Sequence, residues 1–264
     1  MNRIQSLFLL AIISVLLHGC EKPWQPLFNG ENLEGWETYI GTPLNGFEDL
    51  HAAATTNKVF QVIEVDGEKL IRISGEVNGS LATVDTFSNY HLELVFKWGE
   101  KIYTRQNSGL LYHSFGDFGE AIGTWMTNIE CQLMHENLGD TYLMNNTVCE
   151  TKVTQTDAGY TFDPGGQLTQ FGKDFNGPGI KKAVDAEKPL GKWNTVELYS
   201  FGGMTVHVVN GQTVMINTNT GVFEDENIQP LQSGKIQLQS EGGELFIKSI
   251  RIKPIKEIPA EILQ

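Results

Sequence analysis

The stretch NIECQL, residues 128–133, lies near the middle of the chain and alternates apolar with polar side chains. Successive side chains of a β-strand point to opposite faces of its sheet. The second, fourth and sixth residues therefore share one face, whereas Glu130 and Gln132 share the other. This alternation is typical of an antiparallel strand that covers a core on one side. Its polar face is either solvated or the floor of a site.

Similar strand-like segments recur on both sides of this stretch, with Gly, Asn and Asp between them. No window of eleven or more residues shows a helical period. The segments are KVFQVIEV (58–65), EKLIRISG (68–75), YHLELVFKW (90–98), SGLLYH (108–113), NTVELYS (194–200), MTVHVVNG (204–211), QTVMIN (212–217), GKIQLQS (234–240) and ELFIKSIRIK (244–253).

Two of the joins between these segments have the composition of tight hairpin turns. Asp66-Gly67 and Asn210-Gly211 both suit the two positive-φ positions of a type I′ turn. With ten strand candidates and no helix, the sequence predicts an all-β fold of two packed antiparallel sheets. Residues 134–193 are less regular, and we expect loops there that border one mouth of the sandwich.

The first nineteen residues have the pattern of a secretory signal: one charge at Arg3, an apolar run over 7–17, then Gly19. The sequence LLHGC resembles a bacterial lipobox, with Cys20 as the lipidated first residue of the mature chain. Secretion with cleavage nearby is the alternative. A lipid anchor on Cys20 would place the protein in the bacterial cell envelope, on the periplasmic face or the cell surface.

The mature chain is strongly acidic, since removal of Arg3 with the signal takes the net charge from −13 to about −14. Such a chain would approach phosphates against its own field, so we expect no nucleic-acid partner. Cys131 and Cys149 remain, and in an oxidising compartment they either pair or stay as small apolar residues.

No composition break divides the mature chain, which suits one large all-β domain. We expect a signal peptide at 1–19, a lipidated Cys20 with a tether at 20–25, a single domain at 26–255 and a C-terminal tail at 256–264.

Seven segments, taken together and in order, resemble the 3-keto-disaccharide hydrolase domain family, which was long catalogued as a domain of unknown function. They cover nearly the whole mature chain. The segments are PLFNGENLEGWE (26–37), NSGLLYH (107–113), WMTNIECQL (125–133), GDTYLM (139–144), EKPLGKWNTVEL (187–198), VHVVNGQTV (206–214) and GKIQLQSEGGELFIKSIRIKP (234–254).

This resemblance implies a concanavalin A-like (laminarinase-like) jelly roll that acts on sugars whose C3 hydroxyl has been oxidised to a ketone. The ketone acidifies the proton on C2, so a base forms an enolate and the aglycone leaves from C1. Water then adds to the 2-hydroxyglycal. Such a site needs a base, an acid for the leaving oxygen and a hydrogen-bonding or positive group for the enolate oxygen.

From the alternation alone, a solvated face around Glu130 is the simpler interpretation. The resemblance reverses this preference and makes Glu130 a catalytic base or the group that orients the sugar. His113, at a place where relatives carry a basic residue, becomes an acid, base or ligand, although a lone His at a strand end is usually structural. Glu241 stands where some relatives carry a histidine, so it is the next candidate base. The three predicted catalytic residues are thus Glu130, Glu241 and His113.

The predicted substrate-binding residues are spread over the matching segments. Lys97 is a candidate positive charge for an enolate, or a solvated lysine; Trp125 and Tyr142 are candidate sugar-stacking platforms. His207 fits the family pattern and also an ordinary cross-strand histidine. The complete set is Lys97, Asn107, Ser108, Trp125, Gln132, Tyr142, His207 and Gln239.

The sequence leaves a metal and the reaction class open. Candidate nitrogen and oxygen ligands for a divalent metal are His113, Glu130, His135 and Glu241, but they form no contiguous motif. The chain has no GxGxxG nucleotide motif, so a separate oxidoreductase would have to supply the ketone. There are two alternative functions. One is a glycosidase that uses Glu130 and Glu241 as its carboxylate pair, and the other is a non-catalytic carbohydrate-binding module.

Overall fold

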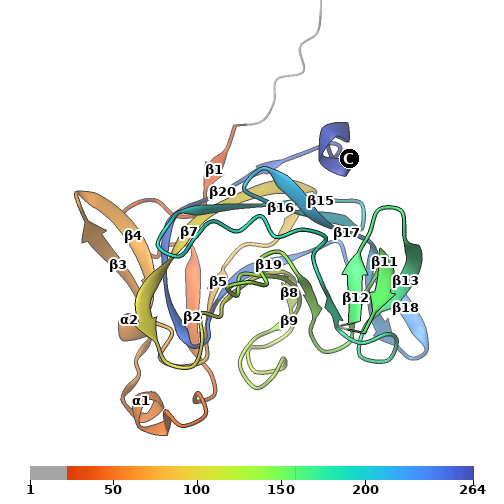
Figure 1. Cartoon of the computed structure of the whole chain (residues 1–264). Coiled ribbons are helices and arrows are strands. Elements are labelled where there is room, and N and C mark those ends of the chain that lie inside the picture. Colours follow the sequence, from red (N-terminus) through yellow and green to blue (C-terminus); the bar gives the residue numbers. More distant parts are fainter. Residues whose placement is uncertain (1–22, 158) are drawn as a thin grey trace, which may run out of the picture.

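The computed structural model describes residues 23–157 and 159–264, which form two face-to-face β-sheets (Figure 1). This confirms the predicted all-β, two-sheet fold. The predicted signal peptide and Cys20 lie outside the described residues. The described helices lack the length and apolar character needed to cross a membrane.

The larger sheet spans the top of Figure 1, and its two ends turn down past the smaller sheet. Its neighbouring strands are antiparallel throughout. In spatial order they are β12 (Gly159–Phe162), β11 (Thr147–Thr156), β17 (Gln212–Glu224), β16 (Met204–Val209), β15 (Asn194–Phe201), β7 (Tyr90–Ile102), β20 (Gly243–Pro254), β4 (Glu68–Ile73) and β3 (Phe60–Val65), with β1 (Gln25–Pro26) beside β20, β13 (Gln167–Phe171) beside β11 and β18 (Asn227–Pro230) beside β17.

The smaller sheet lies beneath it and contains the stretch quoted above as β9, in the interior of the sheet between β10 and β8. In spatial order its strands are β14 (Gly179–Ile180), β10 (Thr141–Leu143), β9 (Thr127–Gln132), β8 (Gly109–Phe115), β19 (Ser233–Ser240), β5 (Gly79–Thr83) and β2 (Trp36–Ile40), with β6 (Phe87–Ser88) beside β19.

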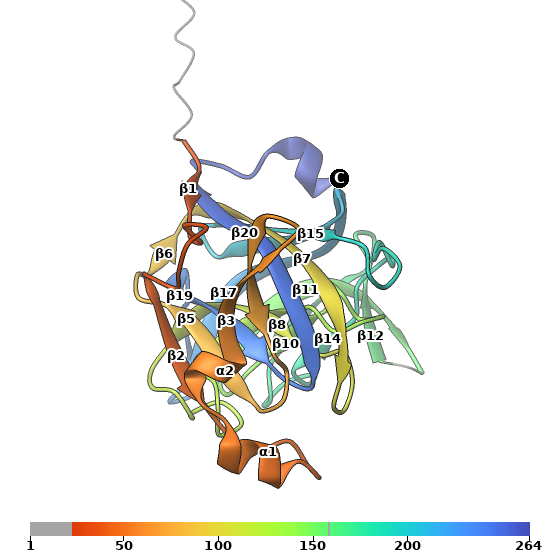
Figure 2. The same cartoon turned by 90° about the vertical axis from the view of Figure 1, so that its left-hand side faces the viewer.

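Helical structure in the described chain is limited to short segments outside the sheets. Figures 1 and 2 place α1 at the end of the molecule far from β1 and from the C terminus. The C-terminal turn packs on the outer face of the larger sheet, where the Thr213 hydroxyl donates a 2.7 Å hydrogen bond to the Ile262 carbonyl. The segments are α1 (Glu48–Ala53), α2 (Thr56–Val59) and the 3₁₀ turn η1 (Ala260–Leu263).

The main core lies between the sheets and includes Ile129, Cys131 and Leu133, all fully buried. The alternation in residues 128–133 is therefore correct: its apolar side chains face the larger sheet. Full burial of an aliphatic side chain contributes about 1.5–3 kcal/mol. A one-residue slip of β9 would expose these side chains and bury its polar ones in the core, so its register is strongly specified.

Both predicted hairpin turns are present. Asp66 and Gly67 have φ of 54° and 79°, and Asn210 and Gly211 have φ of 50° and 83°. Two-residue loops of this kind join β3 to β4 and β16 to β17.

The expectation of loops throughout residues 134–193 is wrong in part. The ten-residue strand β11 lies there and pairs with β17 and with β13. Its sequence, TVCETKVTQT, is rich in threonine and low in large apolar residues, so its β-branched content was the only strand signal.

Cys131 and Cys149 are both buried and carry free thiols. They behave as small apolar residues of the core, and burial raises the pKa of both thiols.

Candidate functional site

Glu130 lies on the face of the smaller sheet that points away from the core. Its strand neighbours are Leu111 on β8 and Tyr142 on β10. The side chain of Glu130 is directed over β8 at Gly109, where a Cβ atom would overlap its carboxyl group. The polar face predicted for β9 is therefore built around a buried carboxyl.

Gln239 reaches the same point from β19, on the other side of β8. A Cβ at Gly109 would lie 2.6 Å from the Gln239 Oε1 atom. Gly109 is the first residue of β8, and its lack of a side chain gives room for the two side chains to converge. Gln239 is 1% exposed, and neither its oxygen nor its nitrogen has a partner among the described residues.

The carboxyl group of Glu130 is 2% exposed, and its Oε1 atom has no hydrogen-bond partner in the described chain. Burial raises the pKa of Glu130 well above its usual range, and the negative charges of Glu241 and Asp140 raise it further. Asp140 is itself held by Lys181, with 2.9 Å between Oδ2 and Nζ. Burial therefore favours the neutral, protonated form of Glu130.

Glu241 is half-buried at the turn that joins β19 to β20, next to this buried carboxyl. Desolvation raises its pKa from 4.5 to about 7, and the charge of Arg105 and a hydrogen bond with Asn107 oppose that rise. Two carboxyl groups in different environments, both with pKa values raised by burial, therefore interact with each other, which suits them to act as the acid and the base of one reaction.

Asn107 and Ser108 precede β8 and tie the site together. The Ser108 hydroxyl donates a 2.8 Å hydrogen bond to the Gln239 carbonyl, which fixes the backbone of β19 against β8. Asn107 is 4% exposed, and its Oδ1 atom lacks a partner in the described chain. Buried polar groups almost always have partners, so these orphaned amide groups are suited to a polar ligand.

The remaining candidates on this face differ in accessibility. Tyr142 is 38% exposed beside Glu130 and can stack on a ligand. Gln132 is half-buried, and its Oε1 accepts a 2.9 Å hydrogen bond from the Met134 amide. Trp125 is 2% exposed and donates from Nε1 to the Gly79 carbonyl at 3.0 Å, so it is a packed wall of the face and not an open platform.

His113, which the resemblance made a candidate catalytic residue, does not lie beside Glu130, because it faces the core. The register of β8 shifts between Tyr112 and Phe115, and His113 has φ of 51°. This bulge turns Tyr112 and His113 to the same side. His113 Nε2 lies 3.0 Å from the Ser200 hydroxyl of the other sheet, and burial lowers its pKa to about 4.

Lys97 also lies away from the site. Its neighbours along β7, Phe96 and Trp98, face the core, so Lys97 points to the outer side of the larger sheet. There its ammonium group lies 4.7 Å from the centre of the Trp193 ring, a cation–π contact.

His207 belongs to the core between the sheets. Its Nδ1 lies 3.0 Å from the Gly139 carbonyl and its Nε2 lies 3.2 Å from the Tyr112 hydroxyl. Burial lowers its pKa to about 4, so it is a neutral structural histidine that links the two sheets.

The four residues that could ligate a divalent metal do not converge. His113 is in the core, and His135 pairs with Glu187 at 3.1 Å. Within residues 23–157 and 159–264, no three His, Cys, Asp or Glu side chains are placed to hold a metal ion.

Two members of the site are not among the predicted residues. Gly109 has a signal in the sequence, a glycine inside a strand pattern, which indicates a close approach. Arg105 lies in a loop and is exposed, and only the fold brings it to Glu241.

The predicted residues that gather here are Glu130, Glu241, Asn107, Gln132, Tyr142 and Gln239, with Ser108 and Trp125 as supports; His113, Lys97 and His207 lie elsewhere. The gathered groups can hold a polar ligand between an aromatic ring and amide groups while one carboxyl accepts a proton and the other donates one.

Comparisons with solved structures agree with this fold. Two crystal structures from Parabacteroides distasonis ATCC 8503, provisionally named glycosyl hydrolases, are 19% and 18% identical to this chain, each with a TM-score of 0.51. The first match covers 88% of this chain and 94% of the other, and the second covers 89% and 100%. At such identities the likeness shows the fold alone.

The comparison with curated proteins found no match. The comparison with protein families found one that spans residues 23–253, almost the whole described chain. The chain therefore belongs to the 3-keto-alpha-glucoside-1,2-lyase-like domain family.

Proposed function

We propose that this protein cleaves 3-keto-glycosides by removing the proton from C2 and expelling the aglycone from C1. The observation that carries the proposal is the pair Glu130 and Glu241, two carboxyl groups whose pKa values are raised by burial, that of Glu241 to about 7, beside the unpartnered amide group of Gln239 and the unpartnered Oδ1 atom of Asn107. Family membership supports a carbohydrate-active function and makes the keto sugar the first substrate to test.

The reaction needs no oxidant. A base takes the C2 proton, and the electrons of that C–H bond move to the C3 oxygen as an enolate. The electrons then return to form the C1–C2 double bond, the bond between C1 and the leaving oxygen breaks, and that oxygen takes a proton. Addition of water, with its oxygen to C1 and a proton to C2, gives net hydrolysis.

The two carboxyl groups lie in different environments, so we give them different roles, as acid and as base, in the proposed reaction. Glu241 is partly exposed and has a pKa of about 7, so it is our candidate base. Burial favours the protonated form of Glu130, which is our candidate acid, and this reverses the order in which the sequence ranked them. The Gln239 amide nitrogen would donate to the enolate oxygen, the Asn107 Oδ1 atom would accept from a sugar hydroxyl, and Tyr142 would stack on the sugar ring.

A two-carboxylate glycosidase is the second candidate function, because direct displacement also uses a pair of carboxyl groups in different environments. The two functions differ in one requirement. Only the elimination needs the ketone at C3.

The test compares nitrophenyl glucoside with its 3-keto counterpart, each as the α and β anomer, using purified protein. We expect nitrophenol release from a keto substrate and none from the parent glucosides. Release from both kinds of substrate would establish the glycosidase. Release from neither, with binding retained, would make the protein a carbohydrate-binding module.

The proposal places the protein in a reaction sequence and a compartment. A separate oxidoreductase must first oxidise the sugar at C3, since this chain has no nucleotide-binding glycine motif. We propose that the protein acts in the bacterial cell envelope, held by lipid on Cys20, because the signal sequence ends at Gly19-Cys20.

A further inference from the structure

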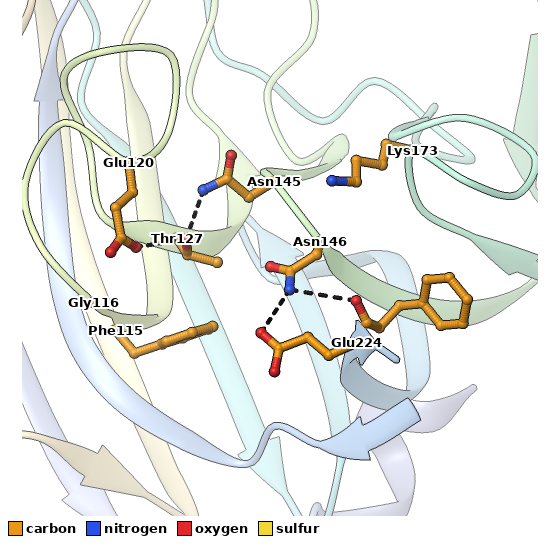
Figure 3. A pocket seen from close by; sticks show the side chains of 9 residues that line it. Phe115, Gly116, Glu120, Thr127, Asn145, Asn146, Lys173 and Glu224 are labelled. Carbon is orange, nitrogen blue, oxygen red and sulfur yellow. Dashed lines mark hydrogen bonds between the residues drawn. The ribbon is translucent and has the colours of Figure 1, made fainter. Parts of the chain in front are cut away.

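A pocket of about 640 Å³ lies at one end of the sandwich, where β8 and β17 end and β9 begins (Figure 3). We call it the rim pocket. Its volume is within the range of about 300–1,000 Å³ that is usual for ligand sites. Its polar lining is formed by Glu120, Thr127, Asn145, Asn146, Lys173 and Glu224.

We propose that the rim pocket binds a neutral glycosyl unit of a glycan, independently of the site at Glu130. This is a second carbohydrate site, and it does not depend on the reaction proposed above.

Two chains of hydrogen bonds fix the polar side chains of the rim pocket in place. Asn145 Nδ2 donates to the Thr127 hydroxyl at 2.7 Å, and that hydroxyl donates to Glu120 Oε2 at 3.1 Å. Asn146 Nδ2 donates to Glu224 Oε1 at 2.9 Å and also contacts the Phe223 carbonyl at 3.4 Å. Side chains that are held before binding lose less conformational entropy when a ligand arrives.

These bonds use the amide nitrogens and leave oxygen atoms for a ligand. One oxygen of each carboxylate and the Oδ1 of each asparagine make no hydrogen bond within the described residues, and Figure 3 shows them around one cavity. Lys173 extends from the opposite side toward Asn145 and forms no ion pair within the described chain. Sugar hydroxyls both donate and accept, so they match a lining of several acceptors and one donor.

The charges of the rim pocket argue against ionic ligands. Glu120 and Glu224 oppose the single ammonium group of Lys173, so an anion would meet net negative charge. That ammonium group and the lack of three metal-ligating side chains within the described residues disfavour a metal ion. Phe115 adds apolar surface to the lining, which suits the C–H face of a sugar ring.

The rim pocket and the site at Glu130 lie on different faces of the smaller sheet. Thr127 and Glu130 are three residues apart on β9, so their side chains point to opposite sides, and their Cα atoms are roughly 10 Å apart. Phe115, which pairs with Thr127, packs against the core between the sheets, whereas Glu130 lies over Gly109 on the outward face. A glycan can therefore occupy the rim pocket while the other site is filled.

The test measures binding by calorimetry with a panel of neutral tetrasaccharides: β-1,4-glucan, α-1,4-glucan, β-1,4-mannan and β-1,4-xylan, with tetragalacturonate as the anionic probe. Asn146→Ala and Glu224→Gln change the rim pocket, and Glu224→Gln retains the side-chain shape at an exposed position. Glu130→Gln and the exposed Lys192→Ala are the matched controls, and circular dichroism verifies that each variant is folded.

We expect at least one neutral tetrasaccharide to bind, with about tenfold weaker affinity in both pocket variants and unchanged affinity in both controls. Turnover of a small 3-keto-glycoside should be the same in the pocket variants as in the wild type, which separates this test from that of the proposed reaction. The proposal is overturned if no neutral probe binds, if tetragalacturonate binds more tightly, or if Glu130→Gln abolishes binding while the pocket variants retain it.

Discussion

Glu130 and Glu241 carry the same functional group in different surroundings. Glu130 is enclosed by protein, and burial raises its pKa, whereas Glu241 is partly exposed at a turn, where Arg105 and Asn107 oppose the rise in its pKa. These different environments, and not the presence of two carboxyl groups alone, suit the pair to act as an acid and a base.

The rate should follow the ionisation of Glu241. We expect kcat/KM for a 3-keto-glycoside to rise with pH and to reach half of its plateau near pH 7, because the base must lose its proton. Arg105→Ala removes a charge that lowers this pKa, so the midpoint should move to higher pH, whereas Arg105→Lys should retain it. A midpoint that is the same in wild type and Arg105→Ala would show that another group is the base.

The free energy of unfolding should depend on pH through the ionisation of Glu130. Its pKa is above 4.5 in the folded protein, so the folded state keeps a proton that the unfolded state loses as pH rises above 4.5. The free energy of unfolding therefore falls with rising pH through this window, by up to about 1.4 kcal/mol per unit of pKa shift. Glu130→Gln should be more stable relative to wild type at pH 8 than at pH 4 in denaturant titrations. An equal difference at both pH values would mean that Glu130 is not buried in its neutral form.

At the scale of strands, the site depends on how β8, β9 and β19 lie side by side. Glu130 and Gln239 come from the two outer strands of this trio and meet over Gly109 of the middle strand. No helix or long loop holds them, so their positions are set by the register of the sheet. A well-supported sheet is a rigid base for catalytic groups.

The substitution Gly109→Ala should lower both turnover and stability. The added methyl group would overlap the Glu130 carboxyl and crowd the Gln239 amide, so we expect turnover to fall at least about a hundredfold, with a loss of about 1–3 kcal/mol in stability from overpacking. Gly165→Ala is the control, since its Cβ would meet only Asp163 Oδ1 at 3.4 Å. Normal turnover in Gly109→Ala would place the chemistry away from Glu130.

The two-residue alternation of apolar and polar side chains predicted much of this architecture. It failed where the backbone departs from a regular strand. It placed Glu130 and Ile129 on the correct faces, since β9 is regular. It could not place His113, because a bulge inside β8 reverses the side on which that residue lies. Lys97 shows a second limit: alternation indicates that it points away from the core, but nothing local indicates to which of the two sheets its strand belongs.

At the scale of the whole molecule, the first described strand, β1, and the candidate site lie on opposite sides. β1 pairs with β20 of the larger sheet, whereas Glu130 faces outward from the smaller sheet. In Figure 1 β1 lies at the top, beside β20 of the larger sheet.

Replacement of Cys20 tests the proposed lipid anchor. We expect Cys20→Ser to leave the membrane fraction, because an anchor of lipid chains holds a protein to a bilayer and a plain N terminus does not. Fractionation followed by immunoblotting measures this, with a second variant, His18→Ala, as a control that keeps the cysteine. Unchanged membrane association of Cys20→Ser would locate the anchor elsewhere.

The central claim is that the C2 proton leaves the sugar during cleavage, and one isotope measurement tests it. A 3-keto-glucoside deuterated at C2 is turned over in ordinary water, and early product is examined by mass spectrometry. Elimination predicts that the deuterium is lost to solvent in every turnover and that Glu241→Gln slows this loss by about 10²–10⁴. Product that retains its deuterium at C2 would contradict the claim, since direct displacement at C1 leaves that bond intact.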